Sequence, residues 1–214
     1  MESAITPHSI RVRRTARYYT LGPTHGFPRE LWIVRHGETK WSRSGQHTGR
    51  TDLPLTELGT LEAQQLAQRL AGRKFDLVLT SPLERASETC RIAGYGDVAR
   101  RCDDLMEWDY GAYEGRRTVD IRKERPGWLL WRDGVPGGET LEQVAARARN
   151  VIALVQATPG DVALFAHGHL LRVLTACWLG LAPDTARMFE LGPGAIGVLS
   201  EQDGASVMRR WNLD

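Results

Sequence analysis

Two short apolar runs in this chain each lead into a histidine followed by a glycine. The run at residues 31–34 precedes Arg35-His36-Gly37, and the run at residues 162–165 precedes Ala166-His167-Gly168. Apolar runs of this length next to glycine are typical of buried strands. Parallel strands end at one edge of a sheet, so the two histidines are expected to meet there.

Strand-like and helix-like segments alternate along the rest of the chain. Besides the strand at 31–34, strands are predicted at 75–79, 98–102, 162–166, 196–200 and 207–211. Helices are predicted at 56–70 with Gly72 as C-cap, from Ser81 onward, at 118–131 with a break at Pro126-Gly127, at 140–157 and at 169–178. This alternation predicts an α/β fold with a layered, mostly parallel sheet. Residues 41–56 are expected to form a long functional loop.

The residues at the predicted strand ends suit phosphoryl chemistry. A neutral imidazole can attack phosphorus through one ring nitrogen while a backbone carbonyl holds the other, and His36 is the candidate. Arg35 offers a planar fork of donors that matches phosphate oxygens. Ser81, Pro82 and Glu84 carry helix-start signals, which would place Arg85 in a first helical turn facing the same edge of the sheet.

Size, charge and cysteine content limit the classes of protein to which this chain can belong. A chain of 214 residues with 42% hydrophobic and 25% charged residues is one soluble domain, and no apolar run reaches the roughly 18 residues of a membrane span. The net charge is +2, but residues 1–30 alone carry +3, so the rest has no basic stripe for nucleic acid. Three scattered cysteines predict reduced thiols in the cytoplasm. Residues 1–29 are expected to be a disordered extension and residues 30–214 the domain.

The chain resembles the histidine phosphatase superfamily, from about residue 31 to about residue 199. The resemblance rests on motifs in a fixed order: Arg35-His36-Gly37-Glu38-Thr39, Thr48-Gly49, Asp52-Leu53-Pro54-Leu55-Thr56 with Gly59, Thr80-Ser81-Pro82-Leu83, Arg85-Ala86, Glu107-Trp108-Asp109-Tyr110-Gly111, Tyr113-Glu114-Gly115, Gly138-Glu139-Thr140 and His167-Gly168-His169. It implies a three-layer, phosphoglycerate mutase-like fold with helices on both faces of the sheet.

The resemblance also implies roles for ten residues. His36 would be the nucleophile, through Nε2 and a phosphohistidine, with Arg35, Arg85 and His167 around the phosphoryl group and Glu107 as general acid. The bound ester would contact Ser42, His47, Thr48, Tyr110 and Gly168. His167 and His169 could be read as a metal pair, but no third ligand is evident, so neither metal nor other cofactor is expected.

These observations predict a metal-independent phosphatase for small phosphate monoesters, with sugar phosphates or bisphosphates as the expected substrates. Residues 41–49 and 107–111 resemble a group of acid phosphatases and sedoheptulose-1,7-bisphosphatase-type enzymes. Alternatives are a phosphoglycerate mutase, a ribazole or other phosphosugar phosphatase, and a binding module without turnover. Neither nucleic acid nor membrane is expected as a partner, and the sequence leaves the oligomeric state open.

Overall fold

A computed structural model describes residues 30–214, so the predicted N-terminal extension lies outside the described residues. Its centre is a six-stranded sheet in the order β3-β2-β4-β1-β5-β6. The strands are β1 (Leu31–Arg35), β2 (Leu77–Thr80), β3 (Arg100–Arg101), β4 (Val162–Ala166), β5 (Ile196–Gln202) and β6 (Ala205–Leu213). The first four are mutually parallel, β5 is antiparallel to β1, and β6 is antiparallel to β5. All six strands were predicted.

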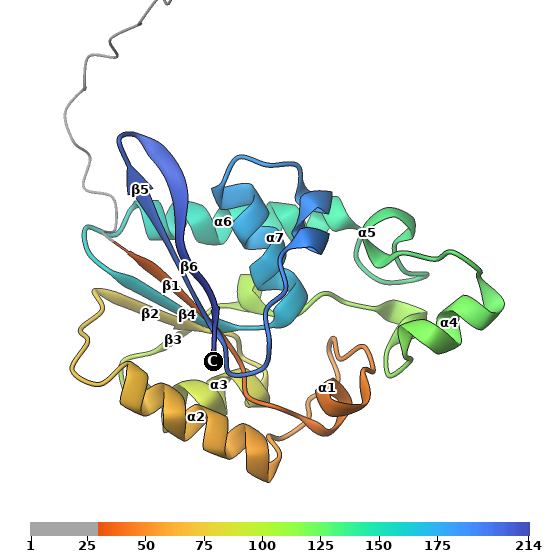
Figure 1. The fold of residues 1–214 in the computed structure, drawn as a ribbon, viewed down its shortest axis with the longest axis horizontal. Coiled ribbons are helices and arrows are strands. Elements are labelled where there is room, and N and C mark those ends of the chain that lie inside the picture. The colour runs from red at the N-terminus through yellow and green to blue at the C-terminus, as the bar shows by residue number, and fades with distance from the viewer. Residues whose placement is uncertain (1–29) are drawn as a thin grey trace, which may run out of the picture.

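Helices cover both faces of this sheet (Figure 1). One face carries α2 (Glu57–Arg69) and α3 (Glu84–Ile92), and the other carries α6 (Leu141–Gln156) and α7 (Gly168–Trp178). Successive side chains of a strand point to opposite faces. Accordingly, Leu31 and Ile33 pack in the core beneath α6 and α7, whereas Trp32 and Val34 pack against residues of α2 and α3. The predicted three-layer α/β fold is therefore confirmed.

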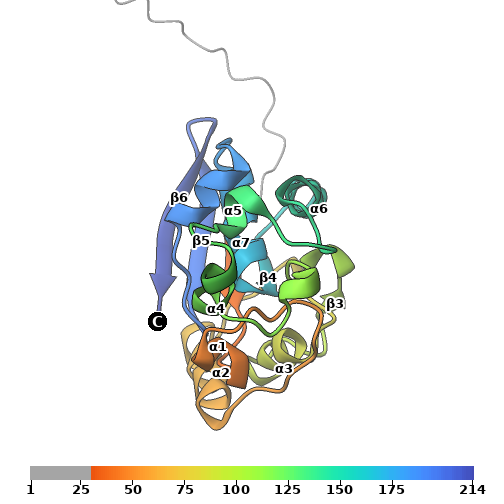
Figure 2. The ribbon, with the colours of Figure 1, turned by 90° about the vertical axis from the view of Figure 1, so that its right-hand side faces the viewer.

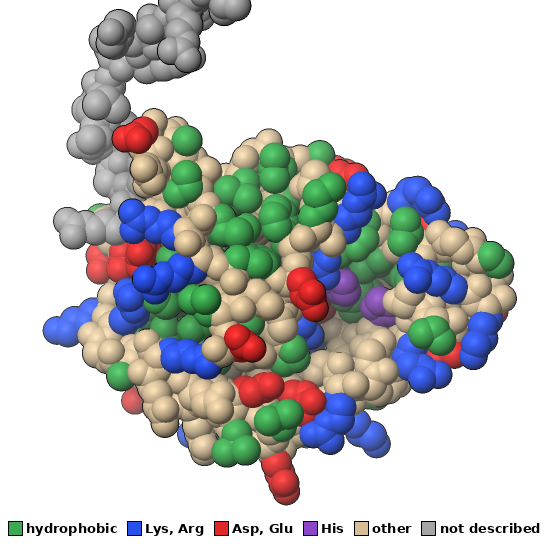
Figure 3. Space-filling model, viewed as in Figure 1, with side chains coloured by type: hydrophobic (Ala, Val, Ile, Leu, Met, Phe, Trp, Pro, Cys, Tyr) green, Lys and Arg blue, Asp and Glu red, His purple; other side chains and the backbone are tan. Residues whose placement is uncertain are grey.

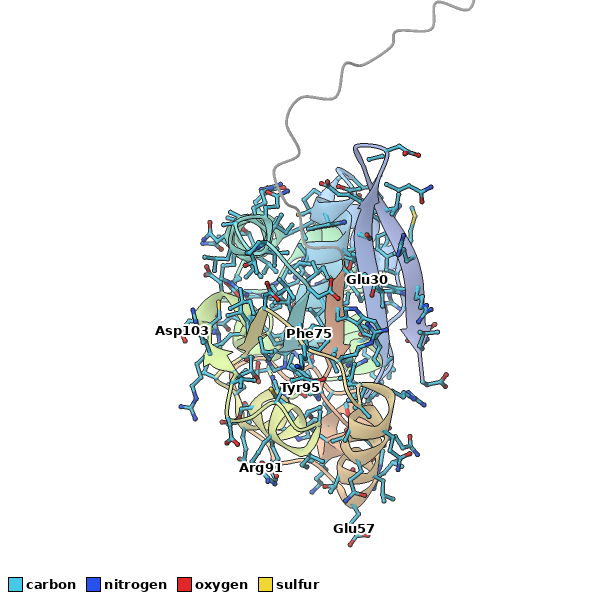
Figure 4. All side chains as sticks on the ribbon, turned by 90° about the vertical axis from the view of Figure 1, so that its left-hand side faces the viewer. Glu30, Glu57, Phe75, Arg91, Tyr95 and Asp103 are labelled. Carbon is cyan, nitrogen blue, oxygen red and sulfur yellow. The ribbon has the colours of Figure 1, made fainter. Side chains whose placement is uncertain are left out.

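Shorter helices lie beyond the carboxyl ends of the parallel strands. They are α1 (Lys40–Ser44), α4 (Thr118–Glu124) and α5 (Leu130–Asp133), and Figure 2 shows α1 and α4 in front of that edge. The opposite end of the sheet, seen in Figure 4, carries Glu30, Phe75 and Tyr95. There the rings of Phe75 and Tyr95 lie 5.3 Å apart. Within residues 30–214, no helix combines the length and apolar character that crossing a bilayer requires.

Three local predictions need correction. The segment 41–56 is not all loop, because Thr39 and Ser42 form a capping box that starts α1, and Gly45 ends it with φ +76°. The third helix begins at Glu84 with Leu83 as its N-cap. Ser81 lies before this cap, and its Oγ accepts hydrogen bonds from the amide of Leu83 at 3.3 Å and from His167 Nε2 at 2.8 Å. The second helix ends at Arg69 with Leu70 as its C-cap, and Gly72 lies in the following turn with φ +76°.

The register of the two central strands brings the candidate residues together. Arg35, the last residue of β1, lies opposite Ala166, the last residue of β4. His36 and His167 are the next residues of these neighbouring parallel strands, and their rings lie 5.2 Å apart between centroids. The expectation that both histidines meet at one edge of the sheet is confirmed.

Candidate active site

A cavity of about 280 Å³ opens at this edge, between the sheet and the shorter helices. Figure 3 shows it as a hollow with histidine side chains on its wall. Eight of the ten predicted site residues line it, namely Arg35, His36, Ser42, His47, Thr48, Glu107, Tyr110 and Gly168. The other two, Arg85 and His167, are completely buried beneath it.

His36 is held as a neutral imidazole with one nitrogen open. Its Nδ1 lies 2.7 Å from the carbonyl oxygen of Gly37. A carbonyl can only accept a hydrogen bond, so Nδ1 carries the proton and Nε2 keeps its lone pair. Burial, together with the cations Arg85 and Arg35, holds the pKa of His36 well below its ordinary value. The ring is therefore uncharged at neutral pH, as a nucleophilic imidazole must be.

Arg35, which lines the cavity, has one buried donor that the protein does not use. Its Nη1 donates to the carbonyl oxygen of Leu191 at 2.6 Å. Its Nε is the single buried side-chain nitrogen or oxygen among residues 30–214 without a hydrogen-bond partner. The guanidinium lies so close to Gly168 that a Cβ there would sit 3.2 Å from Arg35 Cζ. An unpaired buried donor on a cation is costly, so this site is built for an anion.

Arg85 and His167 form the floor of the site. Arg85 donates from Nε to His167 Nδ1 at 3.2 Å, so the His167 proton is on Nε2, which lies 2.8 Å from Ser81 Oγ. The remaining Arg85 bonds go to carbonyl oxygens of residues 48, 49 and 51. Most hydrogen-bonding groups of the Arg85 and His167 side chains thus have partners within the protein. Both ring nitrogens of His167 therefore have protein partners.

Glu107 joins the site to the start of α7. Its carboxylate accepts hydrogen bonds from the backbone amides of His169 at 3.1 Å and Leu170 at 2.9 Å, and from its own neighbour Trp108 at 2.9 Å. The N-cap residue of α7 is His167, whose side chain makes no capping bond. Glu107 therefore satisfies the free amides of this helix end from outside the helix.

The outer wall is made of imidazoles and aromatic rings. Tyr110 shares a hydrogen bond with His169 Nδ1, and the ring of His47 lies 4.8 Å from that of Tyr110. Burial lowers the pKa of His47 to about 4 and holds the pKa of His169 well below its ordinary value. The hydroxyl of Thr118 lies 3.3 Å from His47 Nε2. Uncharged rings and hydroxyls of this kind suit a polyhydroxylated ligand.

The cavity wall contains six further residues that were not predicted as site residues, namely Gly45, Gln46, Thr118, His169, Arg172 and Leu191. Helical spacing could have found Arg172, which lies three residues after His169 on α7. Its guanidinium stacks on Trp131 with Cζ 4.7 Å from the ring centroid. Ser42 is also in the wall, but its hydroxyl donates to the carbonyl of Thr39. No group of three or more potential metal ligands occurs in the part of the chain that is described.

Known proteins are similar in sequence to this protein over most of the chain. An acid phosphatase from Mycobacterium tuberculosis is 37% identical over 178 residues, which cover 81% of this chain and 87% of that protein. Sedoheptulose 1,7-bisphosphatase from Saccharomyces cerevisiae is 40% identical over 184 residues, covering 70% of this chain and 67% of its own. A 2,3-bisphosphoglycerate-dependent phosphoglycerate mutase from Mesorhizobium japonicum is 35% identical over 187 residues, which cover 78% of this chain and 89% of that protein.

Solved structures agree with these matches. The structure of the open reading frame Rv3214 from Mycobacterium tuberculosis aligns with a TM-score of 0.80 and 34% identity, covering 86% of this chain and 97% of that one. The model of the histidine phosphatase superfamily (branch 1) matches residues 31–214. The chain therefore belongs to the histidine phosphatase superfamily.

Proposed function

We propose that this protein is a phosphatase that hydrolyses small phosphate monoesters through a phosphohistidine on His36. The observation that carries the proposal is the pairing of an open, neutral His36 Nε2 with the unpartnered Nε of Arg35 in one cavity. The first group is a nucleophile, and the second is a fixed cation for a phosphoryl oxygen. No other feature of the site combines attack and charge stabilisation in this way.

In the first half-reaction, His36 Nε2 attacks phosphorus, and the bond from phosphorus to the alcohol oxygen breaks. Arg35 stabilises the negative charge on the equatorial oxygens. Arg85, which is completely buried beneath the cavity, adds its positive charge to the site from there. Protonated Glu107 gives its proton to the departing alcohol oxygen. In the second half-reaction, Glu107 takes a proton from water, the oxygen of water attacks phosphorus, and the bond to His36 breaks.

Sugar phosphates and bisphosphates are the substrate class that we propose. One relative is named for a bisphosphorylated sugar, sedoheptulose 1,7-bisphosphate. The cavity of about 280 Å³ suits a small ester, and its wall carries hydroxyl, amide and imidazole groups from Thr118, Gln46 and His47. Such groups pair with sugar hydroxyls. We also propose a cytoplasmic location, which the free thiols of Cys90, Cys102 and Cys177 support.

A phosphoglycerate mutase is the second candidate, supported by the relative of that name at 35% identity. The two activities differ in the fate of the phosphohistidine. A mutase passes the phosphoryl group to a second sugar-acid hydroxyl, whereas a phosphatase passes it to water. A time course with 3-phosphoglycerate and 2,3-bisphosphoglycerate therefore separates them. Release of inorganic phosphate supports the phosphatase, whereas 2-phosphoglycerate formed without a matching amount of inorganic phosphate supports the mutase.

The central experiment is a substrate panel with a chemical quench. Purified protein is assayed against sugar monophosphates, sugar bisphosphates and nitrophenyl phosphate, and the wild type should release phosphate from several of them. His36→Ala should lose activity by a factor of at least about 10³, since only binding and electrostatic terms remain. Acid-labile label from radioactive substrate should appear on the wild type and vanish in the variant. Normal turnover by His36→Ala would refute the proposal.

A further inference from the structure

A salt bridge behind the cavity connects helix α6 to the loop before it. Arg147 of α6 donates from Nε to Glu139 Oε1 at 2.7 Å and from Nη2 to Glu139 Oε2 at 2.9 Å. Only 15% of the Arg147 side chain and 17% of the Glu139 side chain are exposed. A two-point contact between a guanidinium and a carboxylate has a fixed geometry, so the Arg147–Glu139 pair is a rigid unit.

Arg147 also binds the backbone of the segment that carries Glu107. Its Nη1 donates to the carbonyl oxygens of Asp104 at 2.8 Å and Met106 at 2.9 Å, and its Nη2 lies 3.5 Å from the carbonyl oxygen of Glu107 itself. The guanidinium group thus contacts three carbonyl oxygens within the four residues that end at Glu107. A lysine ammonium lacks this planar spread of donors.

Glu139 holds the same segment from its other end. Its Oε2 accepts a hydrogen bond from the amide of Asp109 at 2.9 Å, and its carbonyl oxygen accepts one from Trp108 Nε1 at 2.8 Å. Burial alone would raise the pKa of Glu139, but the hydrogen bonds from Arg147 and Asp109 and the nearby cations Arg147 and Arg50 lower it below its usual value. Glu139 is therefore a carboxylate at neutral pH.

Neither member of the pair lines the cavity that holds His36 and Glu107, so neither is placed to touch a ligand bound there. The carboxyl group of Glu107, by contrast, is in the cavity wall and is bound to the start of α7. Glu107 is consequently fixed twice, at its carboxylate by α7 and at its backbone by the Arg147–Glu139 pair on α6. Loss of the second attachment would leave the side chain bound but free to shift with its backbone.

We propose that Arg147 and Glu139 are positioning residues that set the place of the Glu107 carboxyl relative to the leaving oxygen of the substrate. This inference rests on the proposed function of Glu107 as the proton donor. It predicts that loss of the Arg147–Glu139 pair slows only the reactions in which the leaving group must receive a proton. Sugar alkoxides leave poorly without a proton, whereas nitrophenolate leaves readily, so the two kinds of ester report on the position of Glu107.

The test compares burst-phase rates for a sugar phosphate and nitrophenyl phosphate in four proteins: wild type, Arg147→Gln, Glu107→Gln and the double variant. Arg147→Gln should slow the burst on the sugar phosphate by about 10- to 100-fold, because displacement of a reacting group by about 1 Å costs on that order. The burst on nitrophenyl phosphate should change less than about 3-fold, since its leaving group needs no proton. In the Glu107→Gln background, Arg147→Gln should have little further effect, because the two changes act through one group.

Two further variants control for folding. Arg149 lies on the same helix, and its ion pair with Glu142 is 3.8 Å long and exposed, so Arg149→Gln should match the wild type in every assay. Glu139→Gln keeps an acceptor for the Asp109 amide and is the substitute if Arg147→Gln does not fold; the same selective loss is expected. Unchanged rates, equal losses on both esters, or full additivity with Glu107→Gln would overturn the inference. If Glu107→Gln itself is unselective between the two esters, the proposed acid is wrong and the inference falls with it.

Discussion

A methyl group added at Gly168 tests the anion site most directly, because it presses on Arg35 without removing any hydrogen bond. In Gly168→Ala, the new Cβ would lie 3.2 Å from Arg35 Cζ, 3.3 Å from Nε and 3.5 Å from Nη1. Carbon contacts are comfortable at about 3.5–4.0 Å, so the guanidinium must retreat by a few tenths of an ångström. The bond from Nη1 to the carbonyl oxygen of Leu191, 2.6 Å long, resists that movement.

Stability should change little in Gly168→Ala, whereas activity should fall. Gly168 is the first residue of α7, and glycine in a helix costs roughly 0.5–1 kcal/mol relative to alanine, so the free energy of unfolding should stay within about 1 kcal/mol of wild type. Losing a whole oxyanion donor costs about 10²–10³ in rate, so a displaced donor should lower kcat/KM by about 10-fold. Inhibition by inorganic phosphate should weaken in parallel.

Urea unfolding and steady-state kinetics on one sugar phosphate measure both quantities. Gly192→Ala is the matched control, because its Cβ would meet one atom, Asn212 Oδ1, at an ordinary 3.6 Å, and it adjoins Leu191. This control should behave as wild type in both assays. A stable Gly168→Ala protein with normal kcat/KM and normal phosphate inhibition would refute the argument that the Nε of Arg35 is the anion donor.

Three further predictions concern the leaving group, metal ions and pH. Glu107→Gln should slow the burst on a sugar phosphate by about 10² to 10⁴ and that on nitrophenyl phosphate far less, and equal losses would make Glu107 structural. Activity should survive dialysis against a chelator; restoration by zinc or magnesium after a loss would contradict this. Burial lowers the pKa of His47 from its ordinary 6.5 to about 4 in the folded protein. Between these two pH values the unfolded chain therefore binds one proton at His47 that the folded chain does not bind. The free energy of unfolding should therefore fall as the pH drops from about 6.5 towards 4. Urea unfolding at pH 7 and pH 4.5 measures this loss, and His47→Gln should reduce it by about 2 kcal/mol. An equal loss in His47→Gln would refute the burial of His47 as the cause.

The elements predicted correctly from the sequence are those that are buried in a regular pattern. Strands β1 and β4 are continuous apolar runs because helices cover both faces, and α6 shows an apolar stripe after the Thr140–Gln143 capping box. Helix α1 was missed because it has five residues, none of them buried, and therefore no apolar periodicity. Its sequence signal was confined to the Thr39–Ser42 cap and Gly45.

The positions of the site residues were predicted better than their hydrogen-bond partners. Strand ends and motif order placed His36, Arg35 and Glu107 at the cavity. The partners of Arg85 were not predictable, because the carbonyl groups that it binds belong to a loop 34 to 37 residues earlier in the chain. Ser81 combines a local and a distant partner: its oxygen accepts the amide of Leu83, as a helix-start signal predicts, but it also contacts a histidine 86 residues away, which the sequence does not reveal.

The start of α7 illustrates the same limit and gives it a functional meaning. A helix N-terminus leaves several amides free, and sequence rules look for their acceptor in the N-cap side chain or three residues later. Here the N-cap is His167, whose ring is occupied by Arg85 and Ser81, so the acceptor comes from Glu107, 62 and 63 residues away from the amides it binds. Because β4 ends at the edge of the sheet that carries the cavity, this arrangement sets the carboxyl group and the histidines at one helix end. Binding the helix and presenting the proposed acid are thus tasks of one side chain, so the position of the Glu107 carboxyl is fixed by its bonds to α7.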